Sequence, residues 1–168
     1  MDADPQRKKV LYVEDDDLDL MAMQRAFAAE HLGEWLHVTR DGAQALDWLQ
    51  GAGVYADRSK HPFPDLLLMD IRMPKVSGLE VLRWVRDRPS LSNLPIIMFS
   101  GSDLADDIAD AYRVGANLYL CKPVGNKLRA VVRFIAAWLD LEPAPSANKP
   151  EWGLRAAAAR PIPLRPAA

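Results

Sequence analysis

The sequence has few of the side chains that build disulfides and soft-metal sites. Its 168 residues include one cysteine, Cys121, which excludes both an internal disulfide and a metal site made of several thiolates. The three histidines, His31, His37 and His61, are scattered, and no two of them stand four residues apart as in a helical zinc motif. Carboxylates, hydroxyls and lysines therefore remain as the candidates for chemistry.

Long hydrophobic runs and a charge of one sign are also lacking. No apolar run approaches the roughly 20 residues that span a membrane, and the first nine residues have no apolar signal core. Lys and Arg number 21 and Asp and Glu 23, so the net charge of −2 offers no electrostatic reason to expect nucleic-acid binding. We therefore expect a cytoplasmic protein that binds neither a membrane nor a nucleic acid.

Short apolar runs alternate along the chain with stretches of helical periodicity. Strands are predicted at about 10–13, 35–39, 66–69, 94–99 and 117–121, with a helix after each, at about 18–28, 45–49, 79–88, 103–114 and 128–139. This alternation predicts an α/β fold, a doubly wound five-stranded parallel sheet flanked by helices.

The chain divides into three parts by composition. We expect an N-terminal segment over 1–9, one folded domain over 10–140 and a Pro- and Ala-rich tail or dimerisation arm over 141–168. A few apolar side chains in the tail could dock on this domain or on a second copy of it: Trp152, Leu154, Ile162 and Leu164.

Four apolar residues, 66–69, lead directly into Asp70. A run of this kind is typical of a strand buried on both faces, which places Asp70 at the carboxyl end, where the ligand-binding groups of open α/β sheets gather. Pro74 then turns the chain, and Gly78 stands just ahead of the next helix. One carboxylate is thus predicted at the carboxyl-terminal edge of the sheet.

Other predicted strands also end in reactive groups: Glu14 and Asp15 follow the first, Ser100 ends the fourth and Lys122 follows the fifth. Because the carboxyl ends of parallel strands share one edge, we expect these groups to converge around Asp70. Carboxylates about 5 Å apart repel by about 3 kcal/mol per pair at an effective dielectric near 20, so they need a cation or a proton.

Oxygen ligands without histidine or cysteine select a hard metal ion, and Mg²⁺ suits a site with few carboxylates and a phosphate. Together with a lysine and a hydroxyl, this set describes a phosphoryl-transfer centre in which Asp70 is the nucleophile and becomes an aspartyl phosphate.

These segments, taken in order, resemble the receiver domain of bacterial two-component response regulators. The resemblance rests on residues 13–16, 41–46, 65–78 and 115–123 together with Ser100, and it covers about residues 8–140. It implies a (βα)5 flavodoxin-like receiver fold and a phosphoryl group that passes from a sensor histidine kinase to Asp70.

The resemblance also implies a metal site beside the phosphoacceptor Asp70. Asp15 and the backbone carbonyl of Arg72 correspond to Mg²⁺ ligands, and Glu14 corresponds to a residue that assists through water. The side chain of Arg72, which is long and cationic, could shield the acyl phosphate from water.

Two further residues correspond to the switch of the family. Ser100 matches the hydroxyl that turns toward the phosphoryl group, and Tyr119 matches the aromatic side chain that follows it. Lys122 matches the phosphate-pairing lysine, and it precedes Pro123, whose peptide bond is usually cis in the family. Tyr119 could equally be a packing residue of its strand.

The Glu-Asp pair, the long loop before Asp65 and the absence of an output domain resemble a subgroup of small regulators, some of them partnered with bacterial phytochrome histidine kinases. This narrower resemblance implies a bacteriophytochrome as the kinase, a homodimer, and output through protein contacts. The kinase would dock near Leu18 and Met21 and at the loop 124–126.

Two other functions stay open. An aspartyl-phosphate hydrolase of the haloacid dehalogenase type also uses a strand-end aspartate with Mg²⁺, but it expects a second acid where Arg72 stands. A receiver fold could also serve as an interaction module without phosphorylation. We do not expect turnover of a separate substrate. Simpler interpretations make Cys121 a small buried strand residue, and Asp16 and Asp17 the start of a helix.

Overall fold

The computed structural model describes residues 8–125 and 127–141. All the strand pairs of its sheet are parallel, in the order β2-β1-β3-β4-β5. The strands are β1 (Val10–Val13), β2 (Leu36–Thr39), β3 (Leu66–Met69), β4 (Ile96–Ser100) and β5 (Leu118–Cys121). This topology confirms the predicted doubly wound α/β fold.

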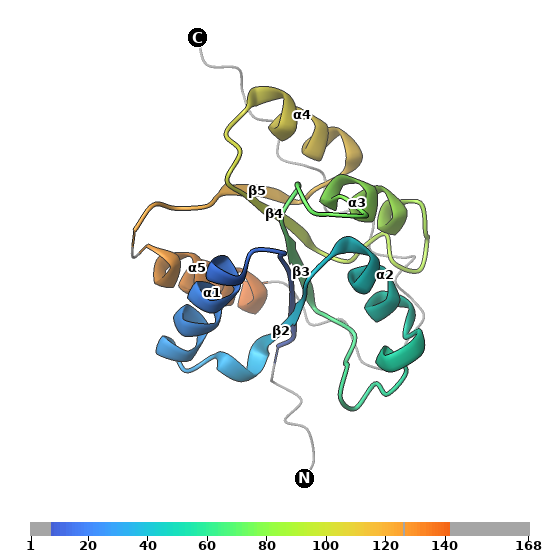
Figure 1. The fold of residues 1–168 in the computed structure, drawn as a ribbon, viewed down its shortest axis with the longest axis horizontal. Helices are drawn as coiled ribbons and strands as arrows, with labels where there is room; N and C mark the ends of the chain where they lie inside the picture. Colours follow the sequence, from blue (N-terminus) through green and yellow to red (C-terminus); the bar gives the residue numbers. More distant parts are fainter. Residues whose placement is uncertain (1–7, 126, 142–168) are drawn as a thin grey trace.

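Helices cover both faces of the sheet. In Figure 1, α1 (Asp17–Ala29) and α5 (Leu128–Leu141) lie side by side on one face, and α2 (Gly42–Gln50), α3 (Gly78–Arg86) and α4 (Ala105–Val114) lie on the other. Two short 3₁₀ turns, Gly33–Trp35 and Gly53–Tyr55, lie outside the sheet layer. The predicted helices are all present, with ends shifted by a few residues.

The central strands are buried on both faces, as an apolar run predicts for a parallel sheet. Every residue of β1, β3 and β4 is buried. Side chains alternate between two core clusters, so that Leu11 and Val13 pack toward α2 and α3 while Val10 and Tyr12 pack toward α1 and α5. This rigid centre holds the carboxyl ends of three neighbouring strands in register.

Local sequence signals place most helix starts. Asp41 caps α2 by accepting from the backbone N–H of Gln44, and Asp16 caps α1 through Leu18 and Asp19, as the simpler interpretation of the acidic run expects. Ser77 opens α3 as a capping box.

Ser102 and Asp103 are of residue types that cap helices, but neither of them caps α4. Its N-cap is Leu104, which makes no side-chain capping bond. The Ser102 hydroxyl donates instead to Asp107 within the helix.

The prediction that Cys121 is buried is wrong, because this residue is exposed. Cys121 ends β5, which is an edge strand of the sheet and pairs with a neighbour, β4, on one side only. The alternation of the sequence identified the strand, but it could not show that the strand lies at the edge.

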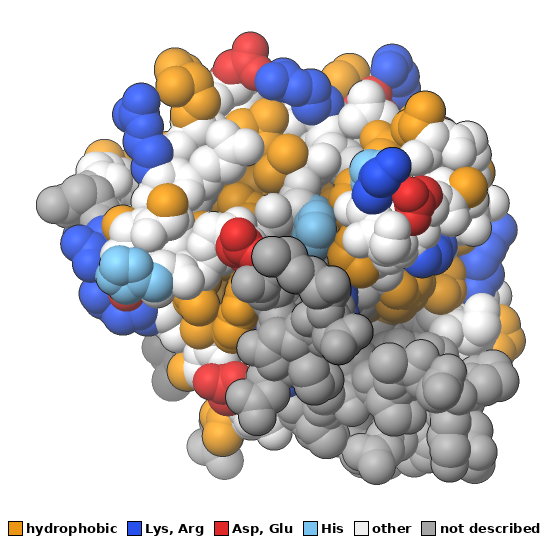
Figure 2. All heavy atoms as spheres, turned by 90° about the horizontal axis from the view of Figure 1, so that it is seen from below, with side chains coloured by type: hydrophobic (Ala, Val, Ile, Leu, Met, Phe, Trp, Pro, Cys, Tyr) orange, Lys and Arg blue, Asp and Glu red, His pale blue; other side chains and the backbone are white. Residues whose placement is uncertain are grey.

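Within the part of the chain that the structure describes, no helix is long and apolar enough to cross a membrane. Figure 2 shows one face of the molecule, on which basic and acidic side chains form separate small groups with hydrophobic ones among them. The described part of this face has no continuous basic surface of the kind that binds nucleic acid.

Candidate functional site

The strand register brings the polar ends of the sheet together. Val13 of β1 pairs with Met69 of β3, so the residues that follow them, Glu14 and Asp70, leave the sheet side by side. On the other flank, the backbone N–H of Lys122 donates to the carbonyl of Ser100 at 2.8 Å. The predicted convergence at one edge is therefore present for residues from four strands.

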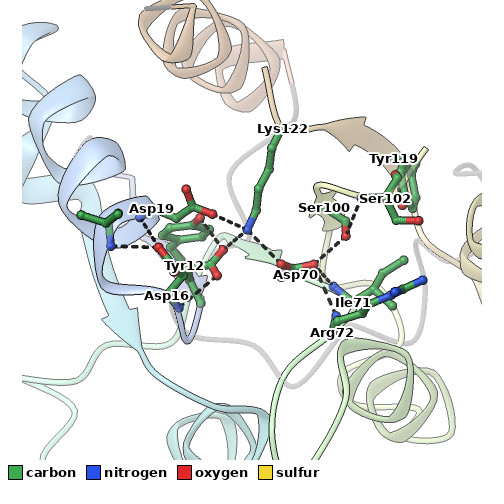
Figure 3. A network of polar contacts seen from close by, with 12 residues as sticks. Tyr12, Asp16, Asp19, Asp70, Ile71, Arg72, Ser100, Ser102, Tyr119 and Lys122 are labelled. Carbon is green, nitrogen blue, oxygen red and sulfur yellow. Dashed lines mark hydrogen bonds and ion pairs between the residues drawn. The ribbon is translucent and has the colours of Figure 1, made fainter. Parts of the chain in front are cut away.

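Asp70 is a nearly buried carboxylate with a full set of donors (Figure 3). Its Oδ1 accepts from the backbone N–H of Ile71 at 2.6 Å and from the hydroxyl of Ser100 at 2.6 Å, and more weakly from the N–H of Arg72. Its Oδ2 accepts from the Nζ of Lys122 at 2.9 Å. The two oxygens thus face different partners, one a hydroxyl and the other an ammonium.

Gly78 allows the next helix to start directly against this strand end. Its N–H donates to the carbonyl of Ile71, and a Cβ at this position would lie 2.0 Å from the backbone oxygen of Asp70. Gly42 plays a similar part in α2, where a Cβ would lie 2.2 Å from the carbonyl oxygen of Val76. The loop between β3 and α3 is therefore held between two glycines.

Lys122 gathers three carboxylates around one ammonium. Its Nζ lies 2.5 Å from Glu14 Oε2, 2.7 Å from Asp19 Oδ2 and 2.9 Å from Asp70 Oδ2. Burial alone would lower the pKa of Lys122, but the hydrogen bonds to these carboxylates outweigh it and raise the pKa above its ordinary value. Lys122 therefore stays charged.

Glu14 is the most buried acid of the cluster. Burial raises its pKa above the usual range, and hydrogen bonds from Lys122 and from the hydroxyl of Tyr12 oppose the rise. Tyr12 is itself fully buried beneath the site, in edge contact with the ring of Phe99. The packed rings of Tyr12 and Phe99 therefore lie beneath the cluster.

Two members of this cluster were missed at the level of sequence. Asp19 reaches Lys122 from the first turn of α1, and Tyr12 reaches Glu14 from within β1. The spacing did hold a signal for Asp19, which stands four residues after Asp15 and would share its face on a helix. For Tyr12, in a strand with no exposed face, the sequence held no comparable signal.

The donor set has the chemistry of a hard divalent cation site. Oxygens of Glu14 and Asp70 converge on the point that Lys122 Nζ occupies, and with Asp19 three carboxyl groups surround one ammonium. Asp15 is exposed beside them, and among the described residues no three acidic, histidine or cysteine side chains are gathered as a ready metal site. Mg²⁺ commonly takes only one or two carboxylates and keeps several waters, so the residues present fit it.

The two predicted switch residues have different hydrogen-bond partners. Ser100 is buried and donates to Asp70, while the hydroxyl of Tyr119 donates to the carbonyl of Ser102 at 2.8 Å. Ser102 therefore stands between them, in the loop from β4 to α4. Tyr119 is buried, and its hydroxyl is bonded to this loop; its part in a switch stays a prediction.

A hollow of about 360 Å³ opens above Asp70. Its walls combine two acids, two cations, two hydroxyls and one apolar side chain, and they are formed by Asp19, Asp70, Arg72, Ser100, Gly101, Ser102, Leu104 and Lys122. Phosphoryl groups bind in hollows with this mixture of cations and hydroxyl donors.

The expectation of a cis bond before Pro123 is wrong for this structure. None of the peptide bonds among the described residues is cis, so the Lys122–Pro123 bond has the trans form that most X–Pro bonds adopt. The position of Lys122 in the acidic cluster is reached with that bond trans.

Comparisons with known proteins agree with this geometry. The model of the response regulator receiver domain matches residues 10–133. The response regulator Rcp1 of Synechocystis is 31% identical over 142 residues, covering 83% of this chain and 95% of Rcp1. The polar-differentiation response regulator DivK of Brucella ovis is 34% identical over 128 residues, covering 76% of this chain and 90% of DivK.

Solved structures extend the comparison. The phosphorylated cyanobacterial phytochrome response regulator RcpA superposes with a TM-score of 0.75 at 33% identity, covering 83% of this chain and 99% of RcpA. A response regulator in red light signaling of R. palustris gives 0.76 at 32% identity, with the same coverage. The Mn²⁺-bound form of Rcp1 gives 0.72 at 32% identity, again with 83% and 99% coverage. The chain therefore belongs to the response regulator receiver domain family of two-component signalling.

Proposed function

We propose that Asp70 accepts a phosphoryl group from a sensor histidine kinase and that the loaded protein signals through altered protein contacts. The observation that carries the proposal is the convergence of Lys122 and Ser100 on the two oxygens of Asp70. An oxygen of Asp70 attacks phosphorus, the nitrogen–phosphorus bond of the phosphohistidine breaks, and the imidazole leaves with the electron pair.

The residues of the chain would each act on this transfer. Lys122 offsets charge on the phosphoryl oxygens, and the hydroxyl of Ser100 is placed to donate to one of them. Mg²⁺, when bound by Glu14, Asp15, Asp70 and the carbonyl of Arg72, supplies further charge neutralisation. These roles rest on the contacts described above and on membership of the family.

Exposed apolar side chains near the hollow offer a docking surface for the kinase. Leu18 and Met21 on α1 and Val124 after β5 are all exposed, Val124 by 91%. These positions correspond to the predicted docking region, of which residue 126 lies outside the described residues. Since the related solved structures include phytochrome response regulators, we propose a kinase of the bacteriophytochrome type in the cytoplasm.

A homodimer is part of the same proposal. Of the predicted arm, 141–168, all but Leu141 lies outside the described residues, and its apolar groups are candidates for contact with a second copy. Arg72 stands where a hydrolase of the haloacid dehalogenase type needs an acid, so the site favours a signalling phosphoacceptor over an enzyme with its own substrate.

The test is the intact mass after incubation with Mg²⁺ and acetyl phosphate or phosphoramidate, followed by a panel of histidine kinases. We expect a gain of one phosphoryl group that depends on Mg²⁺, is lost in Asp70→Asn and persists in Asp65→Asn, which removes a carboxylate near the opposite end of β3. No gain with any donor would instead favour an interaction module that works without phosphorylation.

A further inference from the structure

Two loop residues on the rim of the hollow converge on one carboxylate of α4. Nη2 of Arg72 lies 3.1 Å from Oδ2 of Asp107, and the hydroxyl of Ser102 donates to the same oxygen. Arg72 stands two residues after Asp70, and Ser102 stands two residues after Ser100. Asp107, in the first turn of α4, thereby ties both loops of the rim to that helix.

The carboxylate of Asp107 is well suited to hold the guanidinium of Arg72 in an ion pair. The hydrogen bond from Ser102, helped by the guanidinium of Arg72, keeps the pKa of Asp107 below its usual range, so the carboxylate stays ionised. Its side chain is only 22% exposed, whereas that of Arg72 is 67% exposed. The acid is therefore the anchored partner, and the arginine is the partner that is free to move.

The guanidinium of Arg72 does not touch the phosphoacceptor. Asp70 accepts from the backbone N–H of Arg72, but Figure 3 shows the side chain of Arg72 directed away from the carboxylate of Asp70. Among the described residues, the one ion pair of Arg72 is with Asp107. Arg72 nevertheless lines the hollow in which a group bonded to Asp70 would stand.

We propose that Asp107 is a positioning residue that shortens the lifetime of the phosphoryl group on Asp70 by holding Arg72 away from it. The inference rests on the proposed function. A phosphoryl group brings about two negative charges into the hollow, so its oxygens and Asp107 compete for one guanidinium. An arginine drawn onto the phosphoryl oxygens covers the phosphorus from water, and Asp107 opposes that movement.

The reaction that Asp107 and Arg72 control in this proposal is hydrolysis of the acyl phosphate. The oxygen of a water molecule forms the new bond to phosphorus, and the bond between phosphorus and the Asp70 oxygen breaks. The carboxylate of Asp70 keeps the electron pair, and inorganic phosphate leaves with the protons of the water. Arg72 affects this step by blocking the approach of the water.

The experiment follows the decay of the phosphorylated mass after the donor is removed. Asp107→Asn keeps an acceptor for Ser102 but removes the charge that holds Arg72. We expect a half-life about two- to fivefold longer, the range that fits the loss of one exposed ion pair. Arg72→Asn should shorten the half-life, and Asp107→Asn should have no further effect when Arg72 is already replaced.

Two variants serve as controls. Asp106→Asn removes the same charge from the same turn of α4, at an exposed residue whose side chain makes no hydrogen bond or ion pair with the described residues, and should decay like wild type. Asp107→Glu keeps the charge and should stay near the wild-type half-life. Equal thermal midpoints would show that all variants are folded.

The inference is overturned if Asp107→Asn decays no more slowly than Asp106→Asn. It is equally overturned if the longer half-life persists without Arg72, because the effect would then come from the charge of the helix and not from the arginine. Failure of the proposed function has a different signature, since wild type itself would then gain no phosphoryl mass. That result would remove both proposals together.

Discussion

At the scale of single residues, Lys122 supplies the positive charge that stabilises the buried carboxylates at the edge of the sheet. Glu14 is almost fully buried and Asp70 nearly so, and each has its one charged partner in Lys122 among the described residues. Removing one partner of a buried ion pair leaves an uncompensated charge and costs far more than the pair contributes.

We therefore expect Lys122→Met to lower the free energy of unfolding by about 3–5 kcal/mol. Arg40→Met is the matched control, because Arg40 and Asp17 form an exposed pair whose loss should cost at most about 1 kcal/mol. Urea denaturation of both variants gives the comparison.

The pH dependence of the Lys122→Met variant supplies an internal check. The pKa of Glu14 is already raised in the folded protein by burial, and loss of Lys122 removes an interaction that lowers it. A carboxyl with a raised folded-state pKa destabilises the fold above that pKa. The loss of unfolding free energy in Lys122→Met should therefore become smaller as pH falls. A deficit that stays constant with pH would show that lost packing, and not charge, causes it.

Residue-scale prediction from the sequence was good where a group follows a strand and poor elsewhere. Glu14, Asp70, Ser100 and Lys122 were predictable because parallel strands share one edge. The part played by Asp19 was missed, because it depends on how α1 is placed over that edge, and the sequence fixes no such angle.

At the scale of elements, the connection from β3 to α3 sets the geometry of the site. Gly78 lets the helix begin within contact of the strand end that carries Asp70, and a side chain there would strike backbone atoms. Backbone can yield only by moving the strand or the helix, so the position accepts glycine alone.

Gly78→Ala is expected to destabilise the protein by about 3 kcal/mol or more, because the new methyl group overpacks against the backbone of Asp70. Gly101→Ala is the matched control in the hollow: a Cβ there meets nothing within 4 Å, and the backbone is not left-handed. Gly101→Ala should leave the free energy of unfolding unchanged or raise it by up to about 1 kcal/mol. Thermal unfolding would contradict this account if the two variants melted together.

The boundaries of the helices show where local sequence patterns no longer predict the structure. The strands and helices were identified by periodicity, and the capping residue Asp41 does stand at the start of α2. Ser102 is of a residue type that caps helices, yet its hydroxyl donates to the side chain of Asp107 inside α4 and not to the helix backbone. Competition of this kind between backbone and side-chain partners cannot be resolved from local sequence.

At the scale of the whole molecule, exposed apolar side chains are concentrated on one flank. Seven large hydrophobic residues are exposed in the described part of the chain, and five of them lie on α1, on α5 or in the loop between β5 and α5. The five are Leu18, Met21, Val124, Phe134 and Leu141. Apolar groups collected in this way mark surfaces that bind other proteins.

The proposed dimer follows from this flank and from the composition of residues 142–168. We expect light scattering to give twice the chain mass of 18.7 kDa for the full chain, and a monomer after truncation behind Leu141. Phe134→Ser should weaken the dimer in the full chain, because it removes an apolar contact on the flank.

Val54→Ser is the matched control, since Val54 is 78% exposed but lies away from α1 and α5, in a 3₁₀ turn after α2. It should leave the mass unchanged. A truncated chain that keeps the mass of the full chain would exclude the arm from the interface. If Phe134→Ser then still produced a monomer, the flank itself would join two copies, and phosphorylation at Asp70 would have to act on that surface through α5.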